Sequence, residues 1–432
     1  MSESLLNWDD YLQVASLSDV GMRRSNNQDN LCISLASSMD HWQRKGHVFI
    51  VADGMGAHAA GELASKLAID QIPHLYAKYN DGSPPGELKK AVESANAEIH
   101  RRGQVNEEFF NMGTTCSVLS ILPQGAVVAH IGDSRVYRYS QNRLEQLTFD
   151  HSLVWEMRAA GQLTAEEEEA GKVPKNVITR SLGPYPECKV DLEGPFPVQV
   201  GDTFLLCSDG LTGVVTDDEI GSILGNMSPN EAAKVLVDLA NLRGGPDNIT
   251  VIVVKITHPQ MAGNPKRGTV STSKGSETPI AIWPWIVLAI CVLLGVVLFV
   301  VTNFNWQIAA IPVAVGLGFM IYGIIQAFSG GGPAVKQITQ PLGKGPYIRS
   351  ACQSGQQFAK QLAEMIDKIE AGARDQGWKV DWDQLKKLTR HAETAAGNQD
   401  HSSSIRSYGR AVSFLMDQLR NQTDSSNSSI EL

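Results

Sequence analysis

Five aspartates lie at the ends of predicted strands, beside glycine and among apolar neighbours. They are Asp29 in GMRRSNNQDN, Asp53 in VADGMGAH, Asp133 in HIGDSR, Asp209 in CSDGL and Asp247 in GGPDNIT. One aspartate after a strand is usually a turn former or a helix cap. Five carboxylates delivered to one edge of a sheet would repel one another, and a pair of divalent cations would relieve that repulsion.

The ligand types in this set predict which metal would bind. Carboxylate oxygens without a cluster of His or Cys favour Mg²⁺ or Mn²⁺ over zinc. Glycine next to Asp53 and Asp209 lets the backbone approach a metal closely and frees a carbonyl oxygen to act as a ligand.

Two other catalytic chemistries find no support in the sequence. Cys207 lies inside a predicted strand, which indicates a core residue and not a catalytic nucleophile. Asp150, His151 and Ser152 are adjacent in one tripeptide, where their side chains cannot converge as a catalytic triad does. The six cysteines have no CxxC spacing, which argues against a disulfide framework or a zinc site and favours a reducing compartment.

Length and charge narrow the function classes. At 432 residues the chain is longer than one hydrophobic core usually supports, so we expect two or more units. The net charge is -9 and no dense Lys/Arg stripe occurs, so nucleic acid is not an expected partner. The first residues, MSESLLNWDD, are acidic and do not resemble a secretory signal.

The segment from residue 1 to 258 is predicted to be an α+β domain that positions the aspartates. Short β-branched runs alternate with turns, which is typical of a large antiparallel component. Apolar residues recur at helical spacing over about Gly61 to Tyr79 and Pro85 to Arg102, so these helices would cover the sheet faces.

Eight segments in order resemble the metal-dependent protein phosphatases of the protein phosphatase 2C family, in their bacterial form. They are SDVGMRRSNNQD (18–29), VADGMGAHAAGELAS (51–65), GTT (113–115), HIGDSRVYR (130–138), LTFDHSLV (147–154), NVITRSLG (176–183), LLCSDGLT (205–212) and GGPDNITVIVV (244–254). The resemblance implies a β-sandwich of two antiparallel sheets flanked by helices, with metals in a cleft at one end.

The resemblance also implies roles for individual residues. Asp53 would bridge two metals, the Gly54 carbonyl would bind one of them, and Asp209 and Asp247 would complete the first site. Asp29 would act largely through metal-bound water, and Asp133 with Asp209 would hold a third ion. Arg24 would clamp the substrate phosphate, while Arg23 beside it is interpreted as a solvated neighbour.

The reaction expected from this site needs no phosphoenzyme. Two close metals lower the pKa of a bridging water, orient the hydroxide for in-line attack on phosphorus and neutralise the phosphoryl oxygens. We therefore expect a protein serine/threonine phosphatase that acts on phosphoserine and phosphothreonine proteins and opposes bacterial Ser/Thr kinases.

Several positions depart from the family pattern. Gln28 stands where many relatives carry Glu, and Ala57 replaces a glycine. Met55 takes the place of a histidine proposed as general acid in eukaryotic members, which leaves protonation of the leaving group unassigned; His58 is a candidate with a structural alternative. The acidic segment from Gly161 to Lys175 matches a variable flap near the cleft, and its glutamates are interpreted as a solvated helix face.

A stretch without any charged residue, from Thr278 to Val335, predicts a membrane anchor. Segments 280–302 and 306–328 are each long enough to span a bilayer as a helix, and a buried apolar hairpin is the alternative. Basic residues flank the pair and are missing from the turn, which predicts a two-pass inner-membrane protein with both termini cytoplasmic. The Gly/Pro/Ser-rich segment 259–279 is predicted to be a flexible linker.

The segment 333–420 is predicted to be a small cytoplasmic helical domain. Its apolar residues form two helical stripes, one around Leu362 and one around Val412, which are interpreted as core. This domain is a candidate for protein binding, and the polar residues 421–432 are predicted to be disordered.

Two further hypotheses remain open. A degenerate phosphatase fold could serve as an adaptor with the C-terminal helices as its working part, although retention of Asp53, Asp209 and Asp247 argues against this. A sporulation-type phosphatase shares the fold but generally lacks Arg24 and the GDSR pattern, so it fits less well.

Overall fold

The computed structural model describes most of the chain. It covers residues 7–427 except 57–58, 81, 165, 168–169, 175–176, 264–269, 273–281, 302–306, 308–309, 319–320, 322–335, 339–340, 353–354 and 376. The chain divides into two compact units, residues 1–79, 84–269 and 339–432 forming the first and residues 80–83 and 270–338 the second.

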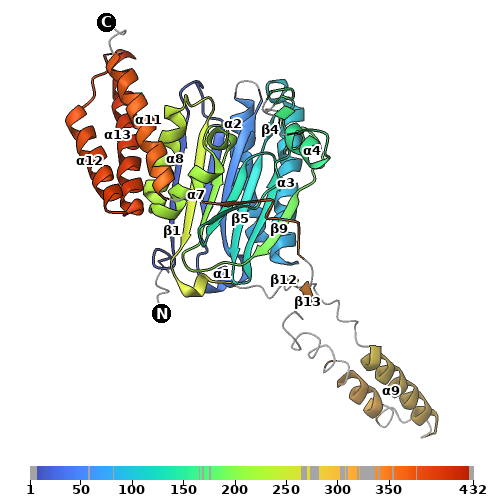
Figure 1. The fold of residues 1–432 in the computed structure, drawn as a ribbon. Helices are drawn as coiled ribbons and strands as arrows, with labels where there is room; N and C mark the ends of the chain where they lie inside the picture. Colours follow the sequence, from blue (N-terminus) through green and yellow to red (C-terminus); the bar gives the residue numbers. More distant parts are fainter. Residues whose placement is uncertain are drawn as a thin grey trace. The chain divides into compact units, whose positions relative to one another are not determined.

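Two antiparallel sheets form the centre of the first unit (Figure 1). In the first sheet the strand order is β1 (Leu12–Asp19), β11 (Ile249–Ile256), β10 (Thr203–Cys207), β7 (Arg135–Ser140), β8 (Arg143–Gln146) and β14 (Ile348–Ala351). In the second sheet the order is β2 (Asp29–Ser34), β3 (His47–Met55), β5 (Cys116–Leu122), β6 (Gly125–Ile131) and β9 (Asp191–Phe196), and β4 (Gly113–Thr114) pairs with the end of β3.

Alternation along the strands divides the side chains between two layers. In β3, Phe49 and Val51 belong to the buried cluster between the sheets, where they join Phe204 and Ile252 of the other sheet. Their neighbour Ile50 faces the opposite side and packs with helical residues. This period of two is expected for strands that are buried on both faces.

Helices cover the outer face of each sheet. The elements are α1 (Met39–Lys45), α2 (Ala60–Lys78), α3 (Pro84–Val105), η1 (Glu107–Phe109), α4 (Leu153–Ala159), α6 (Asp209–Thr212), α7 (Asp217–Asn226), α8 (Pro229–Leu242) and η2 (Pro259–Met261). Helices α2 and α3 pack on the second sheet, and α7 and α8 pack on the first. The predicted sandwich flanked by helices is therefore confirmed.

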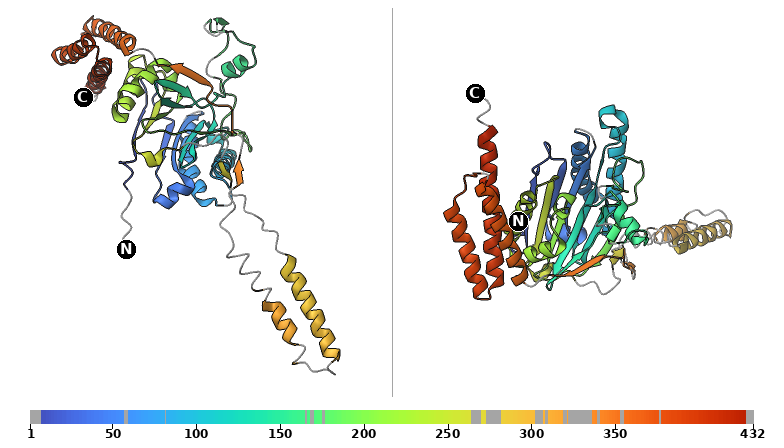
Figure 2. Two further views of the ribbon diagram at one scale, coloured as in Figure 1. Left: turned by 60° about the horizontal axis from the view of Figure 1, so that its bottom comes forward. Right: turned by 45° about the horizontal axis from the view of Figure 1, so that its top comes forward.

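The C-terminal segment of the first unit packs on helices that cover the first sheet (Figure 2). Strand β14 adds to the free edge of β8, and α11 (Gly355–Asp375), α12 (Trp382–Gly397) and α13 (His401–Asn427) follow it. Side chains of α11 and α13, including Phe358 and Val412, share one buried cluster with residues of α8. Helix α13 continues to Asn427, so the segment predicted to be disordered begins inside a helix.

Ion pairs join the C-terminal helices to the rest of the first unit. Arg420 of α13 contacts Asp19 at the end of β1 at 2.7 Å. Lys234 of α8 contacts Asp417 at 2.8 Å, and Arg410 contacts Glu231 at 2.7 Å. Together with the shared cluster, these pairs fix α13 along α8.

The second unit contains the segment that was predicted to span a membrane. Strands β12 (Val270–Thr272) and β13 (Lys336–Ile338) pair with each other, and α9 (Ile282–Val301) lies in the first predicted span. Much of the second predicted span lies outside the described residues, and its continuous helical part covers 310–318. Most of the predicted linker 259–279 also lies outside them.

The predicted transmembrane hairpin is not supported. Within the described part of the chain, no helix combines the length and the apolar character that crossing a bilayer requires. The prediction of a two-pass inner-membrane protein with cytoplasmic termini is therefore wrong.

Candidate active site

Asp53 lies at the centre of the candidate site, near the end of β3. It pairs in register with Asp29, the first residue of β2, so adjacent strands carry the two carboxylates side by side. The backbone of Asp53 is held by Thr114 and Thr115: the Thr115 hydroxyl accepts from the Asp53 amide at 2.9 Å, and the Thr114 hydroxyl donates to its carbonyl at 2.9 Å. The strand end is therefore rigidly placed.

Three other aspartates reach the site from the loops beside the strands. Asp133 lies between β6 and β7, Asp209 begins the short helix α6 directly after β10, and Asp247 precedes β11. Asp29 and Asp133 are only 5% and 8% exposed. Ser208 donates a hydrogen bond of 2.7 Å to Asp29, which links β10 to β2 across the two sheets.

The electrostatics show that the five carboxylates converge. Burial raises the pKa of Asp53 well above its usual range, and each of the other four carboxylates adds to the rise. Burial and the nearby Asp209 raise the pKa of Asp133 to about 8. Burial likewise raises the pKa of Asp29 to about 7, against the stabilising hydrogen bond from Ser208. So much negative charge in one place favours either protons or cations.

The donor set fits a hard divalent cation in its chemistry. Asp29, Asp133 and Asp209 each carry a buried Oδ1 without a hydrogen-bond partner, and such oxygens retain full capacity to bind a cation. In the part of the chain that the structure describes, no three acidic, His or Cys side chains form a ready-made metal-ligating group. The residues therefore supply the right ligand atoms, while their final arrangement depends on the cation.

Among the described residues, Arg24 is the guanidinium that contacts the acidic set directly. Its Nη2 donates to Asp247 Oδ2 at 2.7 Å, and its side chain is half exposed. The hydrogen bond to Asp247 raises the pKa of Arg24, and Asp209 and Asp53 contribute further. Arg24 is thus held at the mouth of the site with part of its guanidinium open to solvent.

The glycines beside Asp53 and Asp209 are required by packing. A Cβ on Gly54 would lie 2.2 Å from the Gly61 carbonyl oxygen, and one on Gly210 would lie 2.0 Å from the Asn248 carbonyl oxygen. Both positions therefore allow two backbone segments to approach closely, which also explains glycine there without a metal.

Asn248 is a site residue that sequence reasoning missed. Its side chain donates to the carbonyls of Val20 and Asn26, both at 2.9 Å, and accepts from the Gln28 amide at 2.8 Å. It thereby ties the loop that carries Arg24 to the start of β11. The quoted segment GGPDNIT contains Asn248, and its place after Asp247 was the available signal.

The tripeptide 150–152 is structural, as predicted. Asp150 forms an ion pair of 2.7 Å with Arg135, and Ser152 caps α4. His151 Nδ1 accepts from the Gly132 amide at 3.0 Å, and its Nε2 contacts Asp191 at 3.0 Å. These contacts hold the loop that carries Asp133 and leave no nucleophile free.

The structure describes only some of the residues that concern protonation of the leaving group and the acidic flap. His58 and Ala57 lie outside the described residues. In the described part of the acidic flap, Glu166 is exposed and Glu167 is partly exposed, in keeping with a solvated face. The side-chain amide of Gln28 is 3.4 Å from the Gly56 carbonyl, so this residue contacts the backbone beside Asp53's strand.

Comparison with known proteins identifies the family. A family model described as protein phosphatase 2C matches residues 23–239. Protein phosphatase PhpP of Streptococcus pneumoniae is 39% identical over 252 residues, which cover 57% of this chain and 98% of that protein. Serine/threonine phosphatase stp of Listeria welshimeri is 37% identical over 213 residues, covering 48% of this chain and 84% of that protein.

Solved structures agree with this result. The Mycobacterium tuberculosis serine/threonine phosphatase PstP/Ppp matches with a TM-score of 0.51 and 34% identity, covering 57% of this chain and 100% of that one. The Streptococcus agalactiae serine/threonine phosphatase matches with a TM-score of 0.51 and 36% identity over the same shares. Since the family model spans half of the chain and the relatives match over most of their own length, this chain belongs to the protein phosphatase 2C family.

Proposed function

We infer that this chain is a metal-dependent protein serine/threonine phosphatase that hydrolyses phosphoserine and phosphothreonine in proteins. The observation that carries this conclusion is the convergence of four carboxylates on Asp53, with Arg24 hydrogen-bonded at the mouth of the same site. The relatives named serine/threonine phosphatase support this substrate class. We further propose that the enzyme opposes Ser/Thr kinases.

The residues that would hold the metals, Mn²⁺ or Mg²⁺, follow from the donor set. We propose that Asp53 serves two ions, that the Gly54 carbonyl binds one of them, that Asp209 and Asp247 complete the first site, and that Asp29 acts largely through water. Asp133 with Asp209 would serve a third ion. The unpartnered buried oxygens of Asp29, Asp133 and Asp209 support this assignment. When bound, the ions supply Lewis acidity and lower the pKa of water enough for hydroxide attack on phosphorus near neutral pH.

The protein's own groups would bind and orient the substrate. Arg24 has a planar guanidinium with free donors, which suits bidentate contact with two phosphoryl oxygens. Asp247 orients Arg24 through the 2.7 Å hydrogen bond. A cysteine-based mechanism is disfavoured because Cys207 is fully buried and burial raises the pKa of its thiol.

We propose that catalysis resides in residues 1–258 and that the helices within 333–420 bind a protein. The packing of α13 along α8 supports a role for these helices beside the catalytic core.

The test is Mn²⁺-dependent hydrolysis of a phosphothreonine peptide by the full chain. Asp53→Asn removes the central carboxylate, so we expect kcat/KM to fall by about 100-fold or more. The matched control is Asp40→Asn, whose carboxylate is 73% exposed and pairs with Arg44 on α1. No turnover by the folded wild-type protein would reject the function, and full activity of Asp53→Asn would reject the site.

A further inference from the structure

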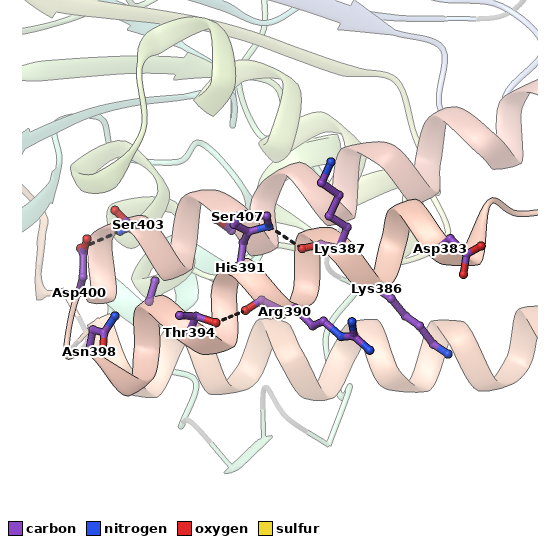
Figure 3. A pocket seen from close by; sticks show the side chains of 11 residues that line it. Asp383, Lys386, Lys387, Arg390, His391, Thr394, Asn398, Asp400, Ser403 and Ser407 are labelled. Atoms are coloured by element: carbon purple, nitrogen blue, oxygen red, sulfur yellow. Dashed lines mark hydrogen bonds between the residues drawn. The ribbon is translucent and has the colours of Figure 1, made fainter.

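A groove lies between α12 and α13 on the C-terminal helices (Figure 3). It has a volume of about 880 Å³. Its lining comes from the outer face of α12 and the first turns of α13: Asp383, Lys386, Lys387, Arg390, His391, Thr394, Ala395, Asn398, Asp400, Ser403 and Ser407. The small side chains at Ala395, Ser403 and Ser407 keep the space between the helices open. Its volume falls in the range of ligand pockets, about 300–1,000 Å³.

Three cations line the groove without carboxylate partners. Lys386, Lys387 and Arg390 are exposed, and among the described residues none of them forms an ion pair. Other cations of the C-terminal helices are engaged: Arg374 of α11 pairs with Glu370 at 2.6 Å, and Arg410 of α13 pairs with Glu231 at 2.7 Å. The charge in the groove is therefore available to a ligand.

The apolar side of α12 explains why these cations share one face. Leu385 and Ala392 are fully buried in the cluster with α11 and α13, so the polar residues at helical spacing must lie on the outside. On a convex surface, this pattern of polar residues would indicate only a solvated helix face. Here the same face forms one wall of a groove whose second wall is another helix.

Neutral polar groups add hydrogen-bonding capacity beside the cations. His391 Nδ1 donates to the Lys387 carbonyl at 2.7 Å, which leaves Nε2 for a ligand. Ser403 and Ser407 are half-buried on the opposite wall. Of the two acidic residues in the lining, Asp400 already accepts a hydrogen bond from the Ser403 amide at 3.0 Å and so caps α13.

We propose that this groove docks an acidic segment of the protein substrate. The groove carries three unpaired cations and two carboxylates, Asp383 and the capped Asp400, so its net charge is positive. The whole chain has a net charge of -9. The groove is larger and more open than a single anion needs, which suits an extended peptide with several carboxylates. The choice of a substrate protein rests on the proposed phosphatase function.

Docking of this kind changes binding and leaves the chemical step alone. A substrate held at the groove reaches the catalytic site at a raised effective concentration. KM should therefore fall for substrates with an acidic extension, while kcat stays the same. A short phosphopeptide without the extension should be indifferent to the groove.

The direct test measures binding of a fluorescein-labelled peptide of alternating Glu and Ser to the full chain by anisotropy. The triple variant Lys386→Ala/Lys387→Ala/Arg390→Ala should weaken binding roughly tenfold or more, from three exposed ion pairs. The matched variant Lys360→Ala/Lys368→Ala/Arg101→Ala removes the same charges from exposed positions outside the groove and should bind within about twofold of wild type. Added salt should weaken wild-type binding.

Several results would overturn the proposal. These are equal affinity of the triple variant and wild type, equal binding of a Gln-for-Glu peptide, or displacement of the peptide by inorganic phosphate or an oligonucleotide at lower concentration than by unlabelled peptide. Turnover provides a separate readout: the triple variant should raise KM only for a phosphothreonine peptide with a Glu-rich extension. Hydrolysis of p-nitrophenyl phosphate should be unchanged, and its absence in every protein would reject the phosphatase function while the anisotropy result still decides the groove.

Discussion

At the scale of single residues, the site combines five aspartates with the exposed guanidinium of Arg24. Arg24 is positioned by Asp247 and by the Asn248 contacts that hold its loop, so its guanidinium is oriented before substrate arrives. Its neighbour Arg23 is exposed. Two adjacent arginines therefore differ in environment, which makes them a matched pair for substitution.

Arg24→Ala should lower kcat/KM for a phosphothreonine peptide by roughly 10- to 100-fold, because a charge-assisted hydrogen bond contributes about 1.5–3 kcal/mol. Most of the change should appear in KM, since the guanidinium binds the phosphate in the ground state as well as in the transition state. Steady-state kinetics with Mn²⁺ measure it. Arg23→Ala is the control and should stay within about threefold; equal losses in both variants would contradict the assignment.

The raised carboxylate pKa values predict a pH dependence of metal binding. Asp29 has a pKa of about 7 and Asp133 of about 8 in the metal-free protein, so protons compete with the cation. The increase in Tm caused by Mn²⁺ should therefore be larger at pH 8 than at pH 6, as measured by differential scanning fluorimetry.

In the metal-free protein, the same raised pKa values predict that folding stability decreases as pH rises. The folded pKa values lie above the unfolded value of about 3.9, so the folded state binds more protons and the cluster's contribution to stability falls as pH rises from about 4 to 8. Asp133→Asn should reduce this fall in metal-free protein. An equal increase in Tm caused by Mn²⁺ at pH 6 and at pH 8 would contradict the role of these carboxylates in metal binding.

At the scale of elements, the C-terminal helices are continuous with the phosphatase core. Phe358 of α11 is fully buried in the cluster that also holds Leu236 of α8 and Val253 of β11. The apolar stripe around Leu362, predicted from sequence as core, packs in this cluster. The C-terminal helices therefore share the buried core that also supports β10 and β11.

Phe358→Ala should destabilise the full chain by about 3–5 kcal/mol, since it leaves a cavity in a packed core. Urea unfolding followed by circular dichroism measures this. Lys360→Ala, on the same helix with its side chain 78% exposed, should change stability by less than about 0.5 kcal/mol. A loss below about 1 kcal/mol for Phe358→Ala would show that α11 does not share the core.

At the scale of the whole molecule, two units differ in how strongly they should affect the catalytic core. Residues 339–432 belong to the same compact unit as the sheets, while residues 270–338 form the second unit. Removal of the C-terminal helices would expose the apolar residues of α7 and α8 that belong to the shared cluster. Among the described residues, none from 270–338 belongs to this cluster.

A chain ending at residue 269 should therefore show a lower Tm and stronger binding of a hydrophobic dye than the full chain, because it exposes a buried apolar surface. Its matched control replaces 273–335 by a short Gly/Ser linker and keeps the paired strands β12 and β13. That control should retain the Tm and the Mn²⁺-dependent activity of the full chain. A lower Tm in the control than in the truncated chain would contradict the division into units.

Residue type and period, which are local properties, were enough to predict the five aspartates of the site and an α+β domain with a large antiparallel component. The two-sheet sandwich and the role of Arg24 were predicted from the resemblance to the protein phosphatase 2C family. Tertiary structure decided how distant segments use one another. Asn248 holds the Arg24 loop, the glycines admit backbone neighbours, and α13 packs along α8 because of contacts between residues far apart in the chain. The absence of charge from 278 to 335 was not enough to establish a membrane span, since no helix in the described part of the chain is long and apolar enough to cross a bilayer.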